Sequence, residues 1–394
     1  MNSFVKLPSW CLCFFLCSCI TDYEAKNIDE ERNILVVEGI ITSGETTITL
    51  SRSLYISDNQ SFIENVSNAL VYIECDDGAK MYAQKDSVTL YGRGERYIIQ
   101  TDMLNMNNKY RLRIELEEYD TKNCIERNGV MTDCPTKIFE YGTDFAYPIA
   151  TPEIESIFWT KNEKGHPIII NLSTQDPNNS VLYYYWSYRE DWEIVSDLES
   201  TEDFPYPYIC WGTTRNSDLL IGSAETTVFG KVTCPITSML PTSRKIEILY
   251  RITVCQNAIS KRAYDYFANI KKNTEQVGSI FTPAPSELRG NIFCITEPER
   301  PVIGYVDISN TTQKQMYISK SDDLHEFAER RWDCEPFSED SLLLWNEGQI
   351  PRDFVPYEKI SMPVGSYLLY VNSMCIDCTH FGTEVRPDNW PSTD

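Results

Sequence analysis

Histidine is scarce in this chain. Only His166, His325 and His380 occur among 394 residues. None of them lies in a His-Glu-x-x-His motif, and the chain also lacks the Gly-x-Ser-x-Gly turn of serine hydrolases and a phosphate-binding glycine loop. Because general acid–base and nucleophilic catalysis usually depend on such groups, the sequence predicts a protein that is not an enzyme and uses no cofactor.

Basic residues are also few. The chain has 35 Lys and Arg against 58 Asp and Glu, which gives a formal net charge of -23. Nucleic-acid binding depends on Lys and Arg contacts to phosphate, so this charge excludes DNA and RNA as expected partners.

Long hydrophobic runs are missing, and the longest apolar stretch lies at the N-terminus. Leu7–Leu16 is too short to span a bilayer, which needs about 20 residues, but it suits a signal peptide over residues 1–18. The following Leu16-Cys17-Ser18-Cys19 resembles a bacterial lipobox, which predicts lipidation of Cys19 and a flexible tether over 19–31. Asp22 and Glu24 resemble the surface-export signal of Bacteroidetes lipoproteins, so we expect a lipid-anchored outer-membrane protein at the cell surface. The alternative is an ordinary signal peptide cut nearby.

Ten cysteines remain after export and lipidation, and an exported chain favours disulfides. Spacing suggests a local bridge between Cys124 and Cys134, and a second pair from Cys210 and Cys234, which flank a hairpin-sized segment. The other predicted disulfide cysteines form a C-terminal group, Cys334, Cys375 and Cys378, although spacing does not fix the pairing. Zinc binding by this group with His380 is the alternative, but a single Cys-x-x-Cys is weak support and we expect no metal.

Period-2 patterns predict a mainly β fold. Tyr110, Leu112, Ile114 and Leu116 alternate with charged residues, as in a half-buried antiparallel strand. Several such strands predict an Ig-like β-sandwich over 32–147, followed by a two-proline linker over 147–152. A larger β-rich domain over 148–394 follows, with one helix near 259–277, where apolar residues recur at helical spacing.

Two segments are candidate binding sites. An aromatic strand forms a candidate platform for a ligand or partner through Tyr183, Tyr184, Tyr185, Trp186 and Tyr188. The alternative is a strand buried on one face with its hydroxyls satisfied at an edge. Residues 190–203 contain seven carboxylates, for which we expect a solvated acidic loop rather than a calcium site, because EF-hand spacing is absent.

Several segments, in order, resemble the domain of unknown function 4249 family: Leu35–Thr42, Leu50–Ser53, Tyr264–Phe267, Ile280–Pro283, Gly290–Ile292, Gly304–Val306 and Cys375–Cys378 with Gly382, Pro387 and Trp390. The resemblance implies a Bacteroidetes outer-membrane lipoprotein, often encoded beside a TonB-dependent transporter, and it transfers no catalytic residue. We therefore expect a non-enzymatic accessory partner of such a β-barrel in nutrient uptake. The alternative is a stand-alone surface module that binds host or matrix molecules.

Overall fold

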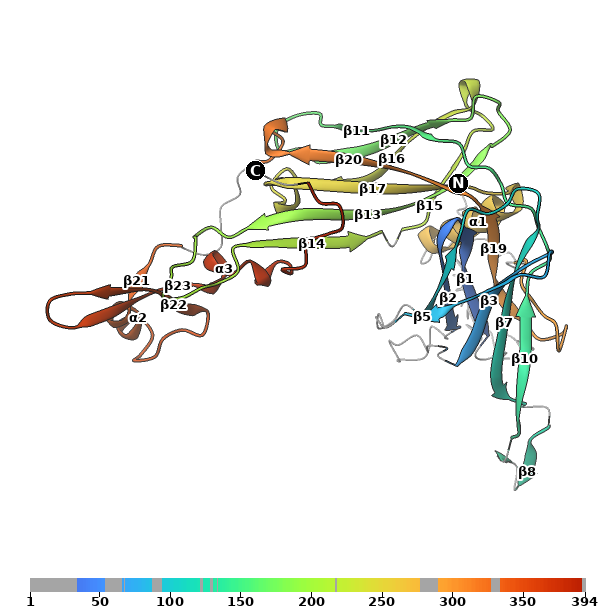
Figure 1. Cartoon of the computed structure of the whole chain (residues 1–394), viewed down its shortest axis with the longest axis horizontal. Coiled ribbons are helices and arrows are strands. Elements are labelled where there is room, and N and C mark those ends of the chain that lie inside the picture. The colour runs from blue at the N-terminus through green and yellow to red at the C-terminus, as the bar shows by residue number, and fades with distance from the viewer. Residues whose placement is uncertain are drawn as a thin grey trace, which may run out of the picture.

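The computed structural model describes residues 34–53, 66, 68–86, 94–120, 123–127, 130–132, 134–216, 218–276, 290–326 and 334–391. Cys19, the signal peptide and the tether lie outside these residues, so the lipidation prediction stays a prediction. Within the described part, the fold is mainly β, as expected, and it has two lobes and an arm (Figure 1). No described helix is both long and apolar enough to cross a membrane.

The first lobe is a sandwich of two five-stranded sheets, which confirms a sandwich-like N-terminal unit. One sheet has the order β19-β1-β2-β6-β5, formed by Val302–Ser309, Leu35–Thr42, Gly44–Arg52, Glu95–Thr101 and Gln84–Lys85. The other has the order β18-β10-β7-β3-β4, formed by Phe293–Cys294, Thr136–Gly142, Tyr110–Tyr119, Ala69–Cys75 and Lys80–Tyr82. The alternating apolar residues of β7 point into the core between the sheets, where Leu112 and Ile114 are fully buried.

The sandwich is not confined to the residues expected to form it, because β18 and β19 come from the C-terminal half. β19 pairs in parallel with β1, with Val37 opposite Gly304. A Cβ on Gly304, whose φ is 147°, would lie 2.1 Å from the carbonyl oxygen of Val37, so glycine permits this close approach. Parallel strands need a long connection, and here it runs through β2–β10 of the first lobe (residues 44–142) and then β11–β17 (residues 154–258) and α1 (Lys261–Gln276).

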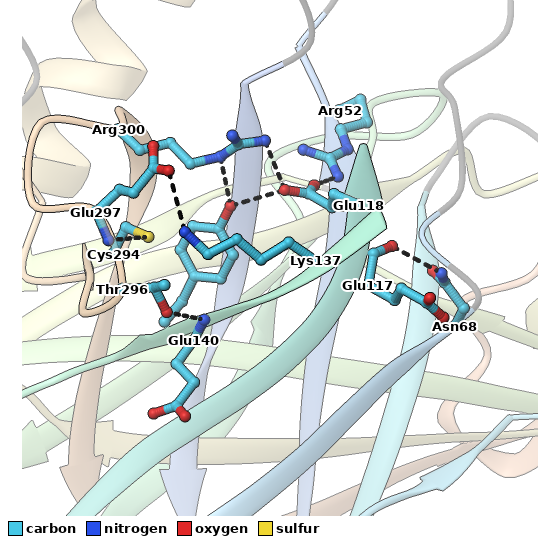
Figure 2. A network of polar contacts seen from close by, with 11 residues as sticks. Arg52, Asn68, Glu117, Glu118, Lys137, Glu140, Cys294, Thr296, Glu297 and Arg300 are labelled. Atoms are coloured by element: carbon cyan, nitrogen blue, oxygen red, sulfur yellow. Dashed lines mark hydrogen bonds and ion pairs between the residues drawn. The ribbon is translucent and has the colours of Figure 1, made fainter. Parts of the chain in front are cut away.

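A buried ionic network fastens this returning segment to the sandwich (Figure 2). Glu118, at the end of β7, forms ion pairs with Arg52 of β2 and with Arg300, whose Nη2 lies 2.6 Å from Glu118 Oε2. The hydroxyl of Tyr141 donates to the same carboxylate at 3.0 Å, and the Arg300 guanidinium stacks 4.1 Å from the Phe139 ring. One carboxylate therefore joins both sheets to the turn before β19.

The second lobe is built from two further sheets around a separate apolar core. The three-stranded sheet has the order β11-β12-β16, formed by Ile154–Thr160, Ile168–Gln175 and Lys231–Met239. The other has the order β14-β13-β17-β20 with β15 also paired to β13, formed by Ile209–Arg215, Tyr183–Val195, Leu249–Ala258, Thr311–Ser319 and Leu220–Ser223. Short 3₁₀ helices occur at Val228–Gly230, Arg244–Ile246 and Lys320–Asp322, and a small hairpin, β8 (Ile125–Arg127) and β9 (Val130–Thr132), extends from the first lobe.

Helix α1, Lys261–Gln276, confirms the predicted helix and lies where the two lobes meet (Figure 1). Its start is capped twice: the Ser260 hydroxyl accepts from the Ala263 amide at 3.2 Å, and Asp307 of β19 accepts from the Ser260 amide at 2.6 Å. Ala263 is buried against Tyr183 of β13 and Ile40 of β1, so the helix contacts both lobes.

Candidate interaction site

A C-terminal arm projects from the end of the second lobe (Figure 1). We use this name for residues 334–378, in which β21 (Phe337–Ser338), β23 (Ser366–Asn372) and β22 (Phe354–Ser361) form a small antiparallel sheet. Helix α2 (Glu339–Trp345) lies beside it, and α3 (Ser373–Ile376) and a 3₁₀ turn at Cys378–His380 follow. Three aromatic rings lie close together in the arm, since the Phe354 ring lies 5.9 Å from Phe337 and 6.1 Å from Trp345.

Two disulfides hold the base of the arm. Cys334–Cys375 closes the arm on itself, and Cys210–Cys378 joins it to β14 of the second lobe. Neighbouring hydrogen bonds reinforce the junction, because the Tyr206 hydroxyl donates to the carbonyl oxygen of Pro356 at 3.0 Å. The arm is therefore covalently fixed to the body.

The outer part of the arm exposes apolar side chains. The β22–β23 turn carries Val364, 94% exposed, with Met362 and Tyr367, and α2 carries Leu344, 86% exposed, and Trp345, 72% exposed. No charged residue occurs between Lys359 and Asp377. Single exposed apolar residues are ordinary, but several on one projecting element make the arm a candidate interaction site. No motif marks this segment in the sequence, and its only local signal is the uncharged run over 360–376.

The predicted aromatic platform is wrong, because both faces of β13 are covered. Tyr184 and Trp186 are fully buried in the core of the second lobe, and their rings stack 5.7 Å apart. Tyr188 packs against the same core. On the opposite face, Tyr183 lies 5.0 Å from the ring of Tyr264 of α1, and Tyr185 packs under the same helix. The run is a structural strand.

The predicted acidic loop is also wrong for its first half. Glu190, Asp191 and Glu193 belong to β13 and are almost completely buried. Glu190 pairs with Lys245 at 2.7 Å and accepts from the Tyr250 hydroxyl at 2.8 Å. The remaining carboxylates follow β13 in the connection to β14, beside the base of the arm.

A C-terminal strap, residues 383–391, covers the other two buried carboxylates. Arg251 Nη2 lies 2.8 Å from Asp191 Oδ2, and its Nη1 donates to the carbonyl oxygen of Asp388 at 2.9 Å. The Trp390 indole donates to Glu193 at 3.0 Å. Each buried charge thus has a partner, so this cluster stabilises the lobe and offers no open carboxylates for calcium.

The described residues contain three disulfides, which confirms disulfide bonding for six of the seven predicted cysteines. Cys124–Cys134 forms as expected in the β8–β9 hairpin. Cys234 is not bonded, so its suggested pairing with Cys210 is wrong: Cys234 packs against the core of the second lobe, and Cys210 reaches Cys378 instead. Cys75, Cys255 and Cys294 are also free thiols.

The donor atoms of Asp197, Cys334 and Cys375 lie within 4.8 Å of one another, in a potential metal-binding group. The two sulfurs are bonded to each other in the Cys334–Cys375 disulfide, so neither provides a thiolate for zinc in this state. The Cys375-x-x-Cys378 pair does not bridge internally, since each cysteine reaches a different element.

A family model described as "Domain of unknown function (DUF4249)" matches residues 20–126 and 135–315, most of the chain. The C-terminal arm lies beyond the match. A search of curated proteins finds none that matches. Among solved structures, a DUF4785 family protein from Legionella pneumophila is similar, with 9% sequence identity and a TM-score of 0.18. The similarity covers 58% of this chain and about half, 51%, of that one.

Proposed function

The chain belongs to the domain of unknown function 4249 family, and from that premise we propose that it is a surface-exposed outer-membrane lipoprotein that docks on a TonB-dependent β-barrel transporter as a non-enzymatic accessory in nutrient uptake. The C-terminal arm is the observation that carries this proposal. A projecting element that exposes Val364 within the uncharged run 360–376, and Leu344 on α2, fits a partner that offers an apolar recess.

Covalent bracing supports a docking role for the arm. Cys210–Cys378 and Cys334–Cys375 limit its motion before any partner binds. An element held in its bound conformation loses less entropy on association, which raises affinity without adding contacts.

The predicted lipid at Cys19 also favours association with the barrel. Anchoring in the membrane of the barrel confines both proteins to one plane and raises their effective concentration, so a modest interface at the arm is sufficient for association. Intact-mass measurement of the native protein tests the anchor: we expect cleavage before Cys19 and an added acyl mass. An unmodified chain cut elsewhere would contradict it.

The docking test compares two exposed valines. We expect the tagged native lipoprotein, extracted in mild detergent, to co-purify with a TonB-dependent barrel in stoichiometric amount. Val364→Asp should lower barrel recovery at least about tenfold, because an interface centre tolerates a buried unpaired charge poorly. Val385→Asp is the matched control, since Val385 is 76% exposed but lies outside the arm.

Equal barrel recovery with both variants would contradict docking through the arm. Recovery of the lipoprotein with its anchor intact but without a barrel would contradict the accessory role. That result would favour the stand-alone binding or adhesion module.

A further inference from the structure

A cavity of about 500 Å³ opens at the end of the second lobe that contacts α1. Its walls come from the β12–β13 connection, with Asp176 and Asn179, and from the segment after β15, with Glu225, Thr227 and Phe229. Small-molecule sites in proteins commonly have volumes of about 300–1,000 Å³. This cavity is separate from the arm and takes no part in the proposed docking.

The walls are held by internal hydrogen bonds. Asp176 Oδ2 accepts from the amides of Ser180 and Val181, at 2.7 and 2.9 Å, which fixes the first wall. Gln175 Nε2 donates to the carbonyl oxygen of Phe229 at 2.7 Å and joins the two walls. The site is therefore preformed.

Phe229 is the unusual residue of this cavity. Its backbone has φ 59° and ψ 23°, a left-handed conformation that bulky residues rarely adopt. Its side chain is nevertheless 85% exposed at the rim, so no packing within the described residues accounts for the ring. Costly backbone geometry of this kind concentrates at ligand-binding sites.

We propose that this cavity binds a neutral, hydroxyl-rich ring compound, a saccharide unit, whose C–H face stacks on Phe229. The face of an aromatic ring is negative and attracts the weakly positive hydrogens of such a ring. The Asn179 amide lines the same space and offers a donor and an acceptor to hydroxyl groups. The side chains of Gln175 and Thr227 donate to the carbonyl oxygens of Phe229 and Ala224, and their own oxygens can accept from a ligand.

The charges of the cavity favour a neutral ligand. No Lys or Arg is among the described residues that line it, so an anion would face Asp176 and Glu225 without compensation. A cation is disfavoured because Glu225 already has partners: it accepts from the Tyr183 hydroxyl and lies 3.7 Å from Lys261 Nζ. Both carboxylate oxygens of Asp176 already accept hydrogen bonds from residues of its own loop.

The test is calorimetric titration of the full processed chain with maltose, cellobiose, lactose and N,N′-diacetylchitobiose, up to about 20 mM. Choline and arginine serve as cationic probes. We expect at least one disaccharide to bind with a Kd of about 1 mM and Phe229→Ala to weaken it about tenfold, the effect typical of lost ring stacking. Phe229→Tyr should retain binding.

Phe158→Ala is the matched control, since Phe158 is also partly exposed, at 37%, but lies on β11 and does not line the cavity. Thermal unfolding of each variant verifies folding. The proposal is overturned if no disaccharide binds, if Phe229→Ala binds as tightly as the parent, or if only choline or arginine binds.

Discussion

Removing the carboxylate of Asp191 should destabilise the second lobe more strongly than any surface charge change. Asp191 and Arg251 are each 1% exposed at their side chains, and they form an ion pair between adjacent strands β13 and β17. Asp191→Ala leaves the guanidinium of Arg251 buried without an anionic partner, held by carbonyl oxygens of the strap and by the ring of Trp390.

The expected loss of unfolding free energy follows from the burial of this ion pair. Breaking a buried ion pair by removing one partner costs about 3–5 kcal/mol, most of it from the uncompensated charge that remains. Asp191 also accepts from the Thr213 hydroxyl at 2.8 Å, so the variant loses a second buried contact. Since single domains are stable by only about 5–15 kcal/mol, this loss is a large fraction of the total.

Urea unfolding of the chain without its lipid, followed by tryptophan fluorescence, measures the effect, because Trp390 lies 5.1 Å from the Arg251 guanidinium. Asp265→Ala is the matched control: Asp265 pairs with Lys261 on the exposed face of α1 and should cost less than about 0.5 kcal/mol. A cost below about 1 kcal/mol for Asp191→Ala would refute the argument that the pair is desolvated.

Two further predictions concern thiols and pH. Among the cysteines that the structure describes, alkylation of the denatured, unreduced chain should modify Cys75, Cys234, Cys255 and Cys294, and peptide mapping that finds Cys234 in a disulfide would contradict the pairing described above. Burial raises the pKa of Asp307, so the stability that its carboxyl contributes is complete below the ordinary value of 3.8 and is lost as the pH rises through the raised pKa. Asp307→Asn should therefore increase the Tm relative to the parent at neutral pH and not at low pH, and equal differences at both pH values would argue against this titration.

The sequence predicted local elements well, because alternation and helical spacing reflect which side chains face the core. The β7 pattern from Tyr110 to Leu116 and helix α1 are confirmed for this reason. The parallel pairing of β1 with β19 was not predictable, since Leu35 and Val302 are separated in sequence by most of the first lobe and by strands β11–β17. No local pattern states which distant strand completes a sheet.

The wrong predictions for β13 have a related cause. In the sequence alone, a run of carboxylates beside aromatic residues predicts side chains exposed to solvent, because the residues that pair with the carboxylates are unknown. Those partners lie far along the chain: Arg251 is 60 residues from Asp191, and Trp390 is 197 residues from Glu193. A charged side chain is stable in the interior only when such partners are present. Composition does not show these partners, so it favours the prediction of an exposed loop.

The free cysteines lie in the two lobes, whereas the disulfides lie in, or at the base of, the elements that project from them. Each lobe has its own large apolar core, and Cys75 and Cys294 remain free thiols inside the first. The disulfides instead lie outside both large cores: Cys124–Cys134 closes the β8–β9 hairpin, and two lie at the base of the arm, where Cys210 and Cys378 belong to a small separate apolar cluster. Small elements need covalent support because they bury too little apolar surface. A braced arm that still exposes Val364 and Leu344 agrees with the proposal that the arm presents these side chains to a partner.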